Sequence, residues 1–114
     1  MRTTILAATL AAFTVSLVHA EDIMASRYGN TTIVTDSKGV QTKLYYNADG
    51  TLTGKQSGTA FKGTWKLDKG QVCLMTEPVP QGMTNPFCRP AIARKVGETW
   101  KVGDRTVTLA KGIQ

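Results

Sequence analysis

Residues 59–67 read TAFKGTWKL, and their alternation indicates the fold class. The large apolar side chains, Phe61, Trp65 and Leu67, fall on odd positions, whereas two lysines and a threonine fall between them. A period of two residues is the pattern of a β-strand with one face buried and the other in water. The stretch therefore predicts a strand with Phe61 and Trp65 as core aromatic residues.

Similar signals recur on both sides of this strand. Runs that are β-branched or alternate in polarity lie at 30–35, 40–46, 51–53, 71–76, 87–93, 99–102 and 105–110. Turn sequences such as Asn47-Ala48-Asp49-Gly50 separate them, and Gly54 to Gly58 (GKQSG) reads as a flexible polar loop. About eight short strands with frequent turn signals are typical of an all-β sandwich or barrel. We predict a small antiparallel barrel or sandwich, formed by residues 21–114 as a single domain.

The first twenty residues are expected to be removed. A short basic start containing Arg2 precedes an uncharged, mostly apolar run from Ile5 to Val18, and small residues flank His19. This three-part layout is typical of a secretory signal peptide. The apolar run is about 14 residues long, short of the roughly 20 that a membrane-spanning helix needs. We predict cleavage after Ala20, export to the periplasm or medium, and no stable membrane insertion afterwards.

The two cysteines, Cys73 and Cys88, both remain after cleavage. Because an exported chain meets an oxidising compartment, we predict that they form one disulfide. Closing a loop of about 16 residues stabilises a fold by roughly 3 kcal/mol in the chain-entropy model. A redox-active pair is the alternative, but that chemistry usually uses a closely spaced Cys-x-x-Cys.

Cleavage also removes the only histidine, His19. The rest of the sequence then lacks the side chain that serves many general bases and metal sites. The aspartates Asp36, Asp49, Asp68 and Asp104 occupy turn signals, where Asp is favoured for its hydrogen bonds to the backbone. We therefore expect no enzyme, no metal and no cofactor, with a carboxylate-based hydrolase as a remote alternative.

The segment between the cysteines and just beyond, residues 77–89, is the best candidate binding loop. Its prolines restrict the free loop, so less entropy is lost when a partner binds, and the disulfide is expected to pin its base. The candidate binding residues are Pro78, Val79, Pro80, Met83, Phe87 and Arg89. The alternative is a long hairpin connection that is stiffened for stability alone.

Loss of Arg2 lowers the net charge by one unit from the +6 of the whole sequence. A positive charge favours acidic envelope components or acidic protein surfaces as partners. The lysines are scattered and only Arg94 and Lys95 are adjacent, so we expect no nucleic-acid binding. The leading hypothesis is a monomeric, non-catalytic binding domain of the cell envelope that engages a protein partner through residues 77–89, as an inhibitor would. The alternative is a carrier of a small apolar or sugar ligand.

Several short motifs together resemble small exported proteobacterial proteins of unknown function. They are Gly29-Asn30-Thr31, Tyr45-Tyr46, Asp49-Gly50-Thr51, Gly63-Thr64-Trp65, Cys73-Leu74 and Cys88. That resemblance implies an exported β-domain with one disulfide. The triplet ending in Trp65 is also similar to the Gly-x-Trp motif of lipocalins, although it lies near the middle of this chain and not on the first strand. This second similarity implies a lipocalin-like ligand carrier in which Arg105 stacks on Trp65.

Overall fold

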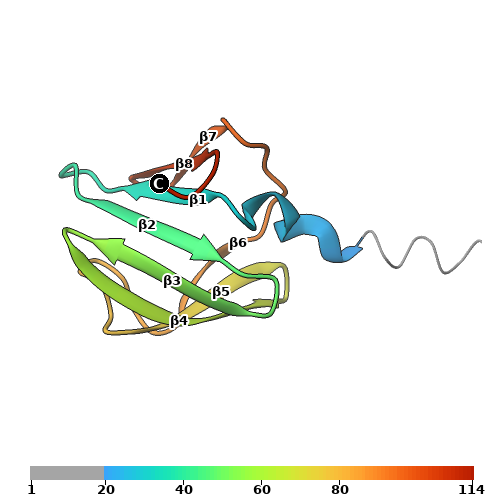
Figure 1. Cartoon of the computed structure of the whole chain (residues 1–114), viewed down its shortest axis with the longest axis horizontal. Coiled ribbons are helices and arrows are strands. Elements are labelled where there is room, and N and C mark those ends of the chain that lie inside the picture. The colour runs from blue at the N-terminus through green and yellow to red at the C-terminus, as the bar shows by residue number, and fades with distance from the viewer. Residues whose placement is uncertain (1–19) are drawn as a thin grey trace, which may run out of the picture.

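The protein is all-β. The computed structural model describes residues 20–114, and the predicted signal peptide, residues 1–20, lies outside them apart from Ala20. A 3-10 helix and eight strands follow one another: η2 (Ala20–Arg27), β1 (Thr31–Thr35), β2 (Gln41–Tyr46), β3 (Thr51–Gln56), β4 (Thr59–Asp68), β5 (Gln71–Glu77), β6 (Phe87–Pro90), β7 (Thr99–Val102) and β8 (Arg105–Ala110). The strands form one antiparallel sheet in the order β6-β5-β4-β3-β2-β1-β8-β7, which curls into a nearly closed barrel (Figure 1). The predicted fold class is confirmed, and of its two forms the barrel is the one adopted.

Alternate residues of neighbouring strands fill the interior of the barrel. The buried apolar side chains that face it are Met24, Leu44, Tyr46, Leu52, Phe61, Val72, Leu74, Val107 and Leu109. Trp65 is partly buried and packs against this cluster. The prediction that Phe61 and Trp65 belong to the core is therefore confirmed, because the period of two along β4 is the alternation of the barrel wall.

Tight turns join the strands where the sequence predicts them. Asp36 Oδ1 accepts the backbone N–H groups of Lys38 and Val40, each at 2.9 Å, and Asp49 Oδ1 accepts that of Thr51 at 3.0 Å. Gly50, at the second of these turns, has a φ of 90°, which glycine adopts at little cost. The turn chemistry therefore fixes where each strand reverses.

The predicted flexible loop from Gly54 to Gly58 is wrong. β3 continues to Gln56, and Ser57 and Gly58, with φ of 50° and 83°, make a two-residue hairpin turn. Gly54 is a buried strand residue opposite Phe61, and a Cβ atom built on it would lie 2.3 Å from Phe61 Cζ. Position 54 needs glycine because any side chain would occupy the space of the Phe61 ring. In the sequence, a glycine selected for packing cannot be told from one selected for flexibility.

The barrel stays open between β6 and β7. The N–H group of Ala91 donates a hydrogen bond to the carbonyl of Gly70. In this register the N–H groups of odd-numbered residues along β6 point toward β5. The backbone N–H positions of residues 86, 88 and 90 therefore point toward the open side. Pro86 and Pro90 have no N–H group, which leaves Cys88 as the one donor at these three positions. The open side of β6 therefore has few donors for a ladder with β7. The strand predicted for 87–93 ends earlier, at Pro90, which is the register partner of Gln71, the first residue of β5.

Side chains and the N-terminal helix cover this opening. The Arg105 guanidinium of β8 lies 5.2 Å from the centre of the Phe87 ring of β6. At the other end η2 closes the barrel, where Met24 is fully buried and Arg27 donates a 3.1 Å hydrogen bond to the carbonyl of Ile92 (Figure 1). The segment 91–98, which links the two edges, is thereby held against η2.

Candidate binding surface at the disulfide hairpin

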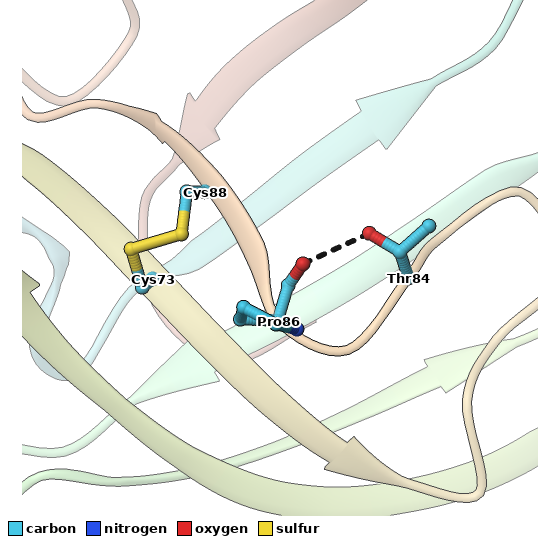
Figure 2. The surroundings of a disulfide bond; sticks show 4 residues. All are labelled: Cys73, Thr84, Pro86 and Cys88. Atoms are coloured by element: carbon cyan, nitrogen blue, oxygen red, sulfur yellow. Dashed lines mark hydrogen bonds between the residues drawn. A yellow bond between two sulfur atoms is a disulfide. The ribbon is translucent and has the colours of Figure 1, made fainter.

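The predicted disulfide joins the two strands that carry the candidate loop. Cys73 of β5 and Cys88 of β6 face each other in register and are bonded, which confirms the pairing (Figure 2). Val72 and Leu74, on either side of Cys73, are buried in the barrel, so the bridge lies on the outer face of the wall. Cys88 is exposed there.

The loop between β5 and β6 is fastened to the end of the barrel by hydrogen bonds. The Gln56 side chain forms two with the backbone of Gln81, both 2.9 Å long, and Arg105 donates one to the carbonyl of Gly82. The Asn85 side chain forms two 2.9 Å bonds with the backbone of Thr76, in the manner of a paired strand. The loop is therefore a fixed part of the barrel surface.

Most of the predicted binding residues turn toward the interior. Pro80 and Arg89 are buried, and Met83 and Phe87 are partly buried against the core. Arg89 donates a hydrogen bond to the hydroxyl of Tyr46, and its guanidinium lies 5.5 Å from the centre of the Phe87 ring. One end of the barrel is therefore closed by Pro80, Met83 and Phe87, whereas Arg89 reaches through the interior to Tyr46. Of the predicted binding residues, Pro78 and Val79 are exposed and available to a partner.

The space left beside these residues is small. A cavity lined by Leu44, Met83, Phe87, Arg89 and Arg105 has a volume of about 20 Å³. One buried water needs at least about 10–15 Å³, whereas a pocket for a drug-sized ligand has about 300–1,000 Å³. The inward-facing loop residues fill the interior at this end, so it offers no room for an apolar ligand of that size.

Outside the barrel, an apolar strip crosses β5 and the start of the loop. Met75 is 48% exposed and Val79 is 45% exposed. A groove of about 740 Å³ lies along one side of Met75, bounded by Gly63, Pro78 and Val79. A second groove, of about 470 Å³, lies along its other side, and the disulfide and Pro86 line it. We call Met75, Pro78, Val79, Pro86 and the Cys73–Cys88 bridge the Met75 strip.

Sequence reasoning missed Met75 and Pro86 as surface residues of this site. Alternation along β5 places Met75 on the face opposite to the buried Leu74, which indicates exposure. The binding residues predicted from the sequence all lie in the loop, so Met75 was left out.

A hydrogen bond fixes the end of the loop beside the bridge. Thr84 Oγ1 donates it to the carbonyl of Pro86 over 2.9 Å (Figure 2).

The carboxylates of Asp49 and Glu98 at the turns accept hydrogen bonds from backbone N–H groups. The Thr51 hydroxyl and N–H groups lower the pKa of Asp49, and the Lys95 N–H and then the Arg94 side chain lower that of Glu98. These groups stabilise their turns in the ionised form. Among the described residues, no three His, Cys, Asp or Glu side chains lie together as a metal site would require.

The expected stacking of Arg105 on Trp65 is wrong, because Arg105 lies over Phe87. Trp65 instead contacts the rings of Tyr28 and Tyr46, with centroids 6.2 and 6.0 Å away, and its Nε1 donates a 2.8 Å hydrogen bond to the carbonyl of Asn47. These contacts pack Trp65 against the core.

The arginines that do stack on a tryptophan lie near η2. The guanidinium groups of Arg94 and Arg27 lie 4.4 and 5.8 Å from the centre of the Trp100 ring. Burial lowers the pKa of Arg27, the ring hydroxyl of Tyr46 acts in the opposite direction, and the charges of Arg89 and Arg94 add to the lowering. This cluster anchors the helix to β7.

Comparisons with protein-family models, curated proteins and solved structures found no match for the chain. Within residues 20–114, no helix has the length and apolar character needed to cross a membrane.

Proposed function

We propose that the protein is an exported, non-catalytic binding domain of the cell envelope, and that the Met75 strip receives an extended apolar segment of a partner protein. The observation that carries the proposal is the pair of grooves, of about 740 and 470 Å³, on the two sides of the exposed Met75. Exposed apolar patches bounded by polar residues are typical of interaction sites.

The rigidity of the strip supports this function. The Cys73–Cys88 bridge holds β5 to β6, and Asn85 and Gln56 hold the loop to the barrel. A partner that binds a fixed surface does not have to order it, so less of the binding energy is lost. Methionine also adapts its shape to an apolar partner, which suits Met75 at the centre.

The composition of the rim supports an apolar segment as the partner. Lys62 faces Glu77 across β4 and β5, and the groove at the disulfide has both Lys66 and Asp68 in its lining. Positive and negative side chains alternate around the strip, so the rim favours neither a positively nor a negatively charged partner. The apolar floor is the feature that distinguishes the site.

Export follows from the predicted signal peptide and agrees with the disulfide, which oxidising compartments permit. The resemblance to small exported proteobacterial proteins stays part of this proposal. A ligand carrier is disfavoured, because the cavity of about 20 Å³ inside the barrel is too small for a drug-sized ligand.

The test compares Met75→Glu with Val96→Glu. Val96 is 44% exposed in the segment between β6 and β7, away from the strip, so it is a matched control for exposed apolar surface. Each variant and the wild type are used as bait in envelope extracts of the source cells, and retained proteins are identified by mass spectrometry. We expect a partner that binds the wild type and Val96→Glu but not Met75→Glu, with equal Tm values for all three. Equal recovery by Met75→Glu, or recovery of no reproducible partner, would overturn the proposal.

A further inference from the structure

Two lysines face each other directly on the outside of the barrel. Lys43 of β2 and Lys55 of β3 are register partners. Their strand neighbours Thr42, Leu44 and Gly54 are buried, so both lysine side chains point outward. Like charges directly opposite in an antiparallel pair destabilise a sheet. The arrangement therefore costs stability unless an anion lies over it.

A third lysine extends the positive surface. Lys38, in the turn before β2, lines the same groove as Lys43 and Lys55, and this groove has a volume of about 590 Å³. The remaining lining residues are uncharged: Gly39, Val40, Gln41, Ser57 and Gly58. Within the described part of the chain, the only salt bridge joins Arg94 and Glu98, so the three lysines have no carboxylate partner.

The nearby acid and the next lysine do not change this balance. Asp36 lies in the same turn as Lys38, but it lines the small cavity inside the barrel and not this groove, and it forms no salt bridge with any described lysine. Lys62 follows on β4, where it faces Glu77. The uncompensated positive charge is thus centred on Lys38, Lys43 and Lys55, which we call the lysine groove.

Hydroxyl and aromatic groups adjoin the lysine groove. Tyr45, two residues beyond Lys43 on the same face, is half-buried and is the register partner of Thr53. Tyr45 donates a 2.6 Å hydrogen bond to the carbonyl of Gln114, which fixes its ring beside the lysines. Sugars offer hydroxyl groups and apolar ring faces, and a single fixed aromatic ring is too little for the serial base stacking that single-stranded nucleic acids use.

We propose that the lysine groove binds an acidic polysaccharide, with Lys38, Lys43 and Lys55 pairing with successive carboxylates of the polymer. The groove is open and is lined by two turns and two strands, which suits a chain of repeated charges that runs across it. This site is separate from the Met75 strip, so the protein can attach to an anionic envelope polymer while it engages a protein partner.

The experiment measures the Kd for polygalacturonate by isothermal titration calorimetry at low salt, with neutral dextran as the uncharged polymer. The variant Lys43→Gln/Lys55→Gln is compared with Lys101→Gln/Lys111→Gln, which removes the same charge from exposed lysines of β7 and the C-terminal segment. We expect the first variant to bind about tenfold or more weakly and the second to change Kd less than about twofold, because close charge pairs carry more of the affinity than distant charges.

Three results would overturn the proposal: no binding of polygalacturonate at low salt, equal loss in both double variants, or tighter binding of single-stranded DNA than of polygalacturonate. An equal loss of affinity in the two double variants would mean that net charge alone attracts the polymer. The Met75→Glu variant should bind polygalacturonate like the wild type, so failure of this inference and failure of the protein-binding proposal are distinguishable.

Discussion

Replacing Gly54 with alanine tests the packing that holds β3 against β4. A Cβ atom at this position would lie 2.3 Å from Phe61 Cζ and 2.6 Å from the carbonyl oxygen of Lys43. The carbonyl belongs to a neighbouring strand of the barrel wall, and the Phe61 ring is 6% exposed within the core. Neither group can move away without disturbing its own contacts, so the added methyl group overpacks the interior.

Overpacking of this kind costs about 1–3 kcal/mol. For a domain of this size, each kcal/mol changes Tm by roughly 4–8 °C, so we expect Gly54→Ala to melt roughly 4 to 24 °C below the wild type. Phe61→Leu shortens the obstructing side chain. In the Phe61→Leu background, Gly54→Ala should lower the free energy of unfolding by at least about 0.5 kcal/mol less than it does in the wild type, because residues in contact are energetically coupled.

Urea and thermal unfolding followed by circular dichroism measure these values for the four proteins of the cycle. Thr53→Ala, an exposed neighbour on the same strand, is the control and should stay within about 0.5 kcal/mol of the wild type. The packing argument fails if Gly54→Ala is as stable as the control, or if Phe61→Leu leaves its cost unchanged.

Three further results are expected. Cys73→Ala/Cys88→Ala should lower the free energy of unfolding by roughly 3 kcal/mol, and a non-reducing urea titration that shows no loss would contradict the loop-closure argument. Lys55→Glu should raise stability by about 0.2–1 kcal/mol by converting the pair with Lys43 to opposite charges, a gain that high salt should remove. The lowered pKa of Glu98 means that its ionised form stabilises the fold above the unfolded-state pKa of about 4.3 and that this contribution disappears as the pH falls through the folded-state pKa. The Tm of the wild type should therefore fall faster than that of Glu98→Gln below about pH 5, and parallel Tm curves would refute this.

The wall of the barrel was predictable because its signal is local. The alternation around Phe61 and Trp65 and the turn residues Asp36 and Asp49 are each set by a few neighbouring residues. The disulfide was predictable because two cysteines in a chain that is predicted to be exported allow one intramolecular pairing. These features required no knowledge of which strands meet.

The candidate site was less predictable because it depends on how distant segments meet. Gly54 reads as a loop residue until Phe61 is placed against it, and the apolar character of Met83 and Phe87 suits a partner surface as well as the barrel end that they close. Arg105 reaches Phe87 because closure of the barrel brings β8, the neighbour of the edge strand β7, close to β6, which the spacing of short strands does not reveal. The exposure of Met75 follows from strand alternation, but its role as a candidate binding residue depends on the two grooves beside it, which only the folded barrel forms.

The order of the strands also has a consequence for folding. Each pairing but one joins strands that are consecutive along the chain, and the exception is β1 with β8, where Thr32 meets Leu109. Local hairpins close small loops quickly, whereas a contact between positions so far apart must overcome a larger loss of chain entropy. We therefore expect the segment from β1 to β6 to assemble first as a curved ribbon and the β7–β8 hairpin to dock onto β1 last, which makes that docking the step that sets the folding rate.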